Sequence, residues 1–369
     1  MTEISDAYAA AYERLGSYRA VADEFGVNES TVRRSLQRRD FRENLDPGIA
    51  DALNRTGITT DTARFGYRRI KDQDGSFNTV FWRLPQEEQA NIIDTIKERL
   101  SDVQPLPKIA KPTQVNSDLL TLYPVADAHL GMMAWGRETG EDYDTATGIK
   151  RLKEWVGQCV DAAPASETGV ILGVGDLLHA DDTTNQTPAS KHALDVDTRH
   201  FKTLSVTIDA MKACIEYAAQ KHDRVIVRIL PGNHDKHAYL AVLLGLAQRY
   251  ESNERVKVQA IPSEFFVHQF GKVMLAAHHG DKAKADRMVH FIADEYAEVW
   301  GKTRHRYLWT GHLHHHKSQD IGGIQWEQLR ALTAKDAYAT SHAYSARAQM
   351  QAITYDRQRG EIQRVKVGL

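Results

Sequence analysis

Cysteine is scarce in this sequence, and long apolar runs are missing. Its two cysteines, Cys159 and Cys214, are far apart and form no Cys-x-x-Cys spacing, which argues against a disulfide framework and a thiolate zinc site. No apolar run reaches the roughly 18 residues of a membrane span, and the N-terminus has neither a basic start nor an apolar core. We therefore expect a cytoplasmic protein with no membrane partner.

A strong net charge is missing too. The formal charge of -2, with 26% charged and 8% aromatic residues, is typical of a globular protein and gives no overall attraction to nucleic acid. Any such binding must come from a local patch. Histidine is abundant by contrast, with 17 residues, and imidazole is the commonest nitrogen ligand for metals in proteins. The length of 369 residues favours two or three domains.

Residues 1–45 have the pattern of a helix-turn-helix-like DNA-binding module. Three helices are expected in it, at residues 5–15, 18–25 and 29–39. Ala22, Gly26 and Val32 stand where such a motif needs a small residue, a left-handed turn and an apolar contact between helices. The third helix is basic, and its candidate DNA-binding residues are Arg33, Arg34, Arg38 and Arg39. The alternative is a three-helix packing module with a solvated arginine face.

Residues 46–103 are expected to form a hairpin and a helix. The stretch 67–84 alternates around Asp74-Gly75, a strong hairpin signal, and Arg68 and Arg69 make its first strand basic. The hairpin is either a wing that lies on a nucleic-acid backbone or a docking element. Residues 86–103 have the pattern of an amphipathic helix. The proline-rich segment 104–116 predicts a linker to a last domain, 117–369.

From residue 117 onward, apolar strands alternate with helices. This pattern predicts an α/β fold with its functional groups at the carboxyl ends of strands. The expected strands are 119–126, 169–174, 224–230, 272–277 and 306–310. The expected helices are 145–162, 195–221, 239–250 and 282–300.

Each expected strand is followed at once by metal-binding side chains. In chain order these are Asp127 and His129, Asp176 and His179, Asn233 with His234 and Asp235, His278 and His279, and His312 with His314. A single Asp-x-His occurs by chance in many proteins, and a lone histidine is more often a hydrogen-bonded core or surface residue. Five such groups in succession predict a metal site. Two divalent ions about 3.5–4 Å apart can clamp a phosphate, and they need a bridging carboxylate, for which Asp176 is the natural candidate.

The order Asp-x-His, Gly-Asp-x-x-His, Gly-Asn-His-Asp, His-Gly and Gly-His-x-His resembles the calcineurin-like metallophosphoesterase superfamily over roughly residues 118–369. The resemblance implies a four-layer α/β/β/α sandwich with two central sheets. It also implies two divalent metal ions, with Mn²⁺ expected before Fe²⁺, Zn²⁺ or Mg²⁺. One ion would be bound by Asp127, His129, Asp176 and His314, and the other by Asp176, Asn233, His279 and His312. Between the adjacent His278 and His279, the family's ligand directly precedes the glycine, which selects His279.

The same resemblance implies catalytic roles. His234 would stabilise or protonate the leaving group, and Asp235 would orient its ring. The motifs around Asp127 and Asp176 look most like the SbcD-type DNA repair nucleases, in which the histidine at the position of His179 contacts the substrate phosphate or supports the catalytic histidine. The stretch after His314 is too short for the DNA-capping domain and ATPase-binding helices of that branch, which argues against an ATPase partner. Residues 1–112 would then engage the DNA.

The leading hypothesis is a two-metal phosphodiesterase that cleaves DNA, with a metal-bridged hydroxide attacking phosphorus and His234 assisting the leaving group. One alternative is a phosphatase or phosphodiesterase that acts on nucleotides or other small phosphoesters, because the ligands report phosphate chemistry and not the leaving group. Another is a DNA-binding regulator with an inactive phosphoesterase fold. The sequence leaves open whether the chain forms a homo-oligomer.

Overall fold

The chain divides into two compact units, Met1–Pro105 and Leu106–Leu369. The structure, a computed structural model, describes residues 2–33, 35–36 and 109–368, and the backbone of 65–71 and 77–83. The expected helix 86–103 and the expected turn at Asp74-Gly75 lie outside the described residues. The division falls inside the expected linker 104–116, and the finer domain boundaries stay predictions.

The first unit begins with two helices, α1 (Thr2–Leu15) and α2 (Tyr18–Phe25), and residues 29–33 and 35–36 are also helical. Gly26 ends α2 at φ 64°, and its N–H donates to the Ala22 carbonyl, so the expected left-handed turn is present. A small apolar core holds these segments together; its buried members are Tyr8, Ala11, Val21, Ala22 and Val32. The helix-turn-helix assignment itself stays a prediction.

The expected hairpin is confirmed as a backbone feature. Strands β1 (Phe65–Lys71) and β2 (Phe77–Arg83) pair antiparallel, with Arg68 opposite Val80 and Arg69 opposite Thr79. Whether it acts as a wing on nucleic acid stays a prediction.

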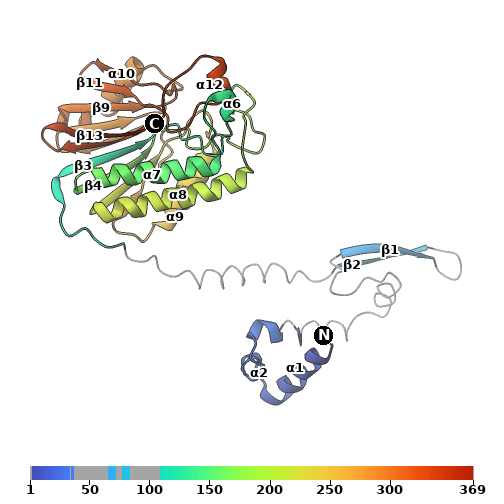
Figure 1. Cartoon of the computed structure of the whole chain (residues 1–369). Helices are drawn as coiled ribbons and strands as arrows, with labels where there is room; N and C mark the ends of the chain where they lie inside the picture. Colours follow the sequence, from blue (N-terminus) through green and yellow to red (C-terminus); the bar gives the residue numbers. More distant parts are fainter. Residues whose placement is uncertain (1, 34, 37–64, 72–76, 84–108, 369) are drawn as a thin grey trace. The chain divides into compact units, whose positions relative to one another are not determined.

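The second unit is a mixed α/β structure with two sheets (Figure 1). One sheet has six strands in the order β13-β12-β3-β4-β5-β6, and the other has five in the order β10-β11-β9-β8-β7. The six are β3 (Asn116–Val125), β4 (Ser166–Gly173), β5 (Arg224–Ile229), β6 (Val256–Val258), β12 (Gln349–Asp356) and β13 (Gly360–Gly368). The five are β7 (Phe266–Phe270), β8 (Val273–Ala277), β9 (His305–Thr310), β10 (Lys317–Ile321) and β11 (Ile324–Gln328). All five expected strands are present.

The four expected helices of this unit are present, two of them with different bounds, and the short α6 and α12 were not expected. The helices are α6 (Gly136–Thr139), α7 (Thr145–Ala162), α8 (His200–Lys221), α9 (Ala238–Arg249), α10 (Ala285–Glu295), α11 (Ala297–Lys302) and α12 (Ala337–Ser341). The helix expected from residue 195 begins only at His200, because the preceding residues pair with the loop after β3: the Met133 N–H donates to the Asp195 carbonyl. The helix expected over 282–300 is interrupted at Tyr296.

The three largest apolar clusters of the second unit lie on the faces of its two sheets. In β3, Tyr123 and Val125 pack with residues of α7, α8 and α9, whereas Leu120 and Leu122 pack with Leu275 and other residues of the five-stranded sheet. The opposite face of that second sheet packs against α10. Successive side chains of a strand point to opposite faces, so strands buried on both faces are apolar throughout.

The topology brings the five motif loops toward one place. β3, β4 and β5 are parallel neighbours in one sheet, and β8 and β9 are parallel neighbours in the other. The carboxyl ends of parallel neighbours lie at the same edge of a sheet. Each sheet therefore delivers part of the candidate site. No helix in the described part of the chain is long and apolar enough to cross a membrane.

Candidate metal centre

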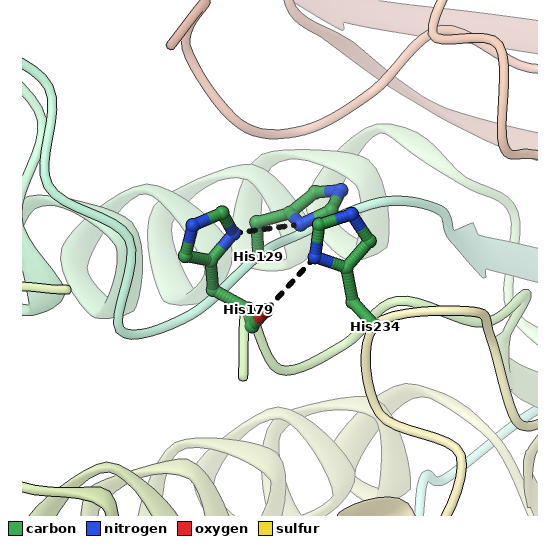
Figure 2. A group of neighbouring side chains, drawn as sticks. All are labelled: His129, His179 and His234. Atoms are coloured by element: carbon green, nitrogen blue, oxygen red, sulfur yellow. Dashed lines mark hydrogen bonds between the residues drawn. The ribbon is translucent and has the colours of Figure 1, made fainter. Parts of the chain in front are cut away.

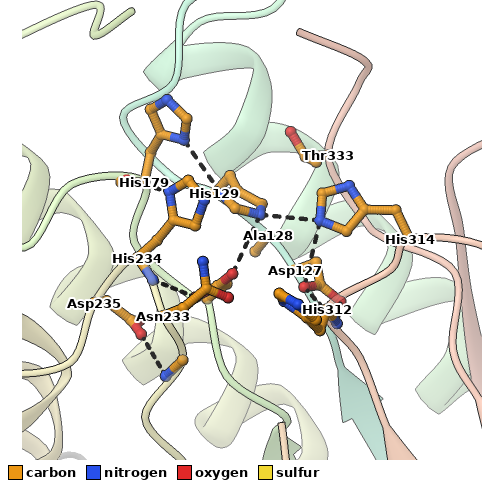
Figure 3. Close-up of polar contacts among 12 residues, drawn as sticks. Asp127, Ala128, His129, His179, Asn233, His234, Asp235, His312, His314 and Thr333 are labelled. Carbon is orange, nitrogen blue, oxygen red and sulfur yellow. Dashed lines mark hydrogen bonds and ion pairs between the residues drawn. The ribbon is translucent and has the colours of Figure 1, made fainter. Parts of the chain in front are cut away.

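Eight of the predicted ligands and catalytic residues meet in one cluster at the carboxyl ends of these strands (Figure 3). Within the described residues, three sets of side chains have ligand atoms that lie within 4.8 Å of one another. They are Asp127, His129 and His314; Asp176, His279 and His312; and His129, His179 and His234.

The first set joins the loop after β3 to the loop after β9. The Nε2 atoms of His129 and His314 are 3.2 Å apart, and His314 Nε2 lies 3.4 Å from Asp127 Oδ1. Asp127 and His129 are buried, with 0% and 3% of their surface exposed. Three ligand atoms that converge in a dry site are suited to a shared cation, because a buried charge needs a partner.

The second set joins the loops after β4, β8 and β9. His279 Nε2 lies 3.2 Å from Asp176 Oδ2 and 3.1 Å from Asn233 Oδ1, so Asn233 lies beside this set. The Nδ1 of His279 lies 2.9 Å from the Val174 carbonyl, to which its N–H can donate. That hydrogen bond fixes the ring with Nε2 toward Asp176, the arrangement by which proteins orient a metal-binding imidazole.

Asp176 connects the two sets. Its Oδ2 is 3.2 Å from Nε2 of His279 and 3.8 Å from Nε2 of His129. Its other oxygen, Oδ1, accepts the backbone N–H of His234 at 2.8 Å. The carboxylate therefore lies between the two sets.

The predicted ligand His279, and not its neighbour His278, faces this cluster. The Nδ1 of His278 accepts the Gly280 N–H at 2.9 Å, and its ring packs against Phe265 with the centroids 4.6 Å apart.

Five of the predicted ligands have left-handed backbone conformations. Among the described residues, eight that are not glycine have a positive φ. Those in the cluster are Asp127 (49°), His129 (43°), Asp176 (50°), His312 (74°) and His314 (58°). Such conformations cost of order 1–3 kcal/mol each and concentrate at functional sites, where the surrounding structure holds them.

Two glycines that were not predicted as site residues make room for the ligands. A Cβ on Gly232 would lie 1.9 Å from Asp176 Oδ1, and one on Gly311 would lie 2.5 Å from Asp127 Oδ2. These contacts are shorter than any real Cβ contact, so only a hydrogen atom fits. Both glycines directly precede a predicted ligand in the sequence, which is the signal that could have identified them.

Burial and charge set the protonation of the imidazoles. Burial lowers the pKa of His179 to about 3 and, with the neighbouring His234, holds the pKa of His129 well below its usual range. Burial also acts to lower the pKa of His279, but the Asp176 carboxylate outweighs it and raises that pKa to about 10. His129 and His179 are neutral and offer lone pairs, and His279 offers one once a cation displaces its proton, so the donor set fits divalent metal ions of the Mn²⁺, Fe²⁺ or Zn²⁺ type.

The third set places three histidines beside one another (Figure 2). The Nδ1 atoms of His129 and His179 are 3.2 Å apart. The ring of His234 stands 4.6 Å from that of His129, and its Nδ1 lies 2.9 Å from the backbone carbonyl of His179. His179 thus supports His234 through its main chain.

The expected role of Asp235 needs correction. Its Oδ1 accepts the Gly232 N–H at 2.8 Å, and its Oδ2 accepts the Leu178 N–H at 3.1 Å. The ring of His234 donates to the His179 carbonyl instead. Because two main-chain donors occupy its carboxylate, Asp235 orients the loop that carries His234 and not the ring.

A segment after β11 also reaches the cluster, although no motif marks it. The Thr333 N–H donates to the Asp127 carbonyl at 3.2 Å, and its hydroxyl contacts the Met132 sulfur at 3.7 Å. Figure 3 shows Thr333 beside His314. These are main-chain and weak contacts, which residue type does not reveal.

The predicted DNA-binding arginines belong to the first unit. Arg33 is half exposed, pairs with Glu29 at 2.9 Å and lies over the Tyr18 ring at 5.4 Å. Arg68 and Arg69 lie in β1, whose backbone alone is described. The remaining predicted positions, Arg34, Arg38 and Arg39, lie outside the described residues.

No protein-family model and no curated protein matches this chain. Solved structures that resemble it include a predicted phosphoesterase from Streptococcus pneumoniae (10% identity, 69% of this chain and 100% of that one, TM-score 0.29). An archaeal phosphodiesterase is 12% identical, and the match covers 68% of this chain and 99% of that one with a TM-score of 0.35. The structure of Vps29 with Zn²⁺ from Entamoeba histolytica is 12% identical, and the match covers 67% of this chain and 98% of that one with a TM-score of 0.29. At TM-scores this low the likeness adds nothing to the geometry of the site.

Proposed function

We propose that this protein is a two-metal phosphodiesterase of the calcineurin-like metallophosphoesterase type, with the four-layer sandwich of that superfamily and with DNA as its substrate. The observation that carries the proposal is the position of Asp176 between the two donor sets, 3.2 Å from His279 and 3.8 Å from His129. One carboxylate shared by two sets of ligands is what a pair of closely spaced dications requires.

The donor atoms decide which residues would bind each ion. Asp127, His129 and His314 would bind one, Asn233, His279 and His312 the other, and Asp176 both. No thiol competes, because burial raises the pKa of both Cys159 and Cys214 to about 12. When bound, two such ions neutralise the charge that develops on a phosphate and supply an activated water-derived nucleophile.

The chain's own groups then act on the leaving side. The His179 carbonyl accepts a hydrogen bond from Nδ1 of His234 and so fixes the ring plane. The Nε2 of His234 is left to donate a proton toward the departing oxygen of the ester. Asp235 accepts hydrogen bonds from the N–H groups of Gly232 and Leu178, which joins the loop after β5 to the loop after β4.

DNA as substrate is supported by arginines on two segments of the N-terminal unit. Arg33 extends from a helical segment with its guanidinium half exposed, and β1 carries Arg68 and Arg69. Cations on one helix and one strand suit the phosphates of a polynucleotide more than a small ester.

The test is hydrolysis by the full-length protein, first stripped of metal and then loaded with Mn²⁺. We expect cleavage of bis(p-nitrophenyl) phosphate and of single- or double-stranded DNA, and loss of both in His234→Ala. The control His290→Ala changes an exposed histidine of α10 and keeps full activity. Cleavage of the small ester without cleavage of DNA would assign a small phosphoester instead. If neither substrate is hydrolysed, the protein is not a phosphodiesterase and the inactive regulator becomes the better hypothesis.

A further inference from the structure

Four exposed rings form a continuous run outside the metal centre. The rings of Tyr338 and His342 stack with centroids 4.1 Å apart and an interplanar angle of 30°. Tyr344 continues the run at 6.0 Å from His342, and His192 extends it on the other side at 6.1 Å from Tyr338. Tyr338 and Tyr344 keep 55% and 59% of their surface exposed. The run therefore offers ring faces to a ligand instead of filling a core.

Both segments that carry these rings start at the metal centre. Thr333 is tied to Asp127 by a main-chain hydrogen bond of 3.2 Å, and Tyr338 follows it by five residues, a reach of at most about 18 Å. His192 lies in the loop that continues from His179, and the Asp195 carbonyl binds that loop to the Met133 N–H. In Figure 1, α12 lies beside α6, which follows the loop after β3. The rings are therefore carried by segments that are tied to the metal centre.

Charge near the rings selects the occupant. Lys335 precedes Tyr338 and Arg347 follows Tyr344, and neither makes an ion pair within the described part of the chain. The acid of this segment, Asp336, accepts the Ala339 N–H and caps α12, and the acids on the other side of α12, such as Glu138 and Asp195, line the pocket beside Ala337. Stacked rings flanked by cations are the combination that binds single-stranded nucleic acid, since every base has a face to stack and every linkage a charge. In a duplex the bases stack on one another, so they have no free face that could stack on the rings.

We propose that His192, Tyr338, His342 and Tyr344 form a stacking surface for the unpaired bases of a polynucleotide whose backbone enters the metal centre. The inference rests on the proposed function and names its substrate class, a single strand or a single-stranded end. Bases further along the strand from the scissile phosphate lie on the rings, and the strand continues from them to the ligands.

The test compares two oligonucleotides of equal length and charge, one of thymidines and one of abasic residues. Binding is measured by fluorescence anisotropy with full-length, Mn²⁺-loaded protein that carries His234→Ala, so that the strand is not cut. Any contribution of the N-terminal unit to phosphate binding is the same for both strands. The ratio of the two dissociation constants therefore measures the contribution of base stacking alone. We expect the thymidine strand to bind about tenfold or more tightly than the abasic strand, because one or two stacked bases contribute at least that much affinity.

Matched variants locate the effect. Tyr338→Ala and Tyr344→Ala should each reduce that ratio about fivefold or more, and Tyr338→Phe should retain it because the ring remains. Tyr217→Ala removes an exposed tyrosine of α8 and should change nothing. Equal binding of the two strands by the parent protein, or a ratio unchanged by Tyr338→Ala and Tyr344→Ala, overturns the proposal. Hydrolysis of bis(p-nitrophenyl) phosphate by the same alanine variants with His234 intact tests the metal centre separately, and its absence would refute the proposed function without touching the binding ratio.

Discussion

The carboxylate of Asp176 lies 3.2 Å from the imidazole of His279, although the two residues come from different sheets. Asp176 follows β4 of the six-stranded sheet, and His279 follows β8 of the five-stranded one. This contact, with those of His279 to Asn233 and His129 to His314, ties together the parts of the centre that the two sheets deliver. Because the same carboxylate also approaches His129, the two donor sets are not independent.

The first prediction concerns metal content. Asp176→Ala should reduce the bound divalent metal from two ions per chain to none, because both ions lose a ligand and their charges lose a shared counter-charge. Elemental analysis of the purified variant measures this. His278→Ala is the matched control, since His278 is adjacent to His279 but faces Phe265, and it should retain both ions. Two ions retained by the Asp176 variant would show that the bridge is assigned wrongly.

Much of the ligand set could be predicted from the sequence, because each ligand follows an apolar strand by a few residues. Asp127 and His312 are examples, and the strands before them are present as expected. What could not be predicted depends on three-dimensional contact. The carbonyl of His179 as the partner of His234, and the two N–H donors that occupy Asp235, are main-chain contacts that any residue type could make.

The second sheet was recognised only through the family resemblance. The apolar pattern predicts its strands β8 and β9, but β10 is short and exposed, so apolar periodicity does not reveal it. The start of α8 differs from the expected one for a related reason. Helical periodicity extends back to residue 195, but pairing with the loop after β3 holds those residues extended.

A second prediction concerns Gly232. Gly232→Ala would place a methyl group 1.9 Å from Asp176 Oδ1 and 2.4 Å from the Asp176 nitrogen. The carboxylate would have to move, so we expect loss of metal and of hydrolysis by at least about a hundredfold, with destabilisation of about 1–3 kcal/mol from overpacking. The control is Gly301→Ala in α11, where a Cβ meets nothing within 4 Å. That variant should be as active as the parent and slightly more stable. Full activity in Gly232→Ala would contradict the close packing around Asp176.

A third prediction concerns pH. Without metal, His279 keeps its proton up to about pH 10, because the charge of Asp176 raises its pKa despite burial. A divalent ion must displace that proton, so the apparent affinity for Mn²⁺ should fall about tenfold when the pH drops by one unit. By the same linkage, this pair stabilises metal-free protein fully below the ordinary histidine pKa, and the contribution is lost as the pH rises toward 10.

Calorimetric titration with Mn²⁺ in two buffers of different ionisation enthalpy counts the released protons. We expect at least about one proton per chain. The variant His290→Ala, changed at an exposed histidine away from the ligands, should release the same number. Affinity that stays constant with pH would mean that His279 is neutral before metal binds.

The last prediction concerns the basic helix of the first unit. Replacing Arg33, Arg34, Arg38 and Arg39 together by alanine should weaken binding to duplex DNA and flatten its salt dependence, by about 0.9 in the logarithmic slope for each phosphate that is no longer neutralised. Arg14→Ala with Arg19→Ala removes exposed cations from the two preceding helices and should leave the slope nearly unchanged. Filter binding across a series of salt concentrations gives both slopes. Arg33 already pairs with Glu29, so we expect the single substitution Arg33→Ala to change the slope least of the four. An unchanged slope in the fourfold variant would show that these arginines do not contact DNA, and DNA binding would then have to come from the second unit.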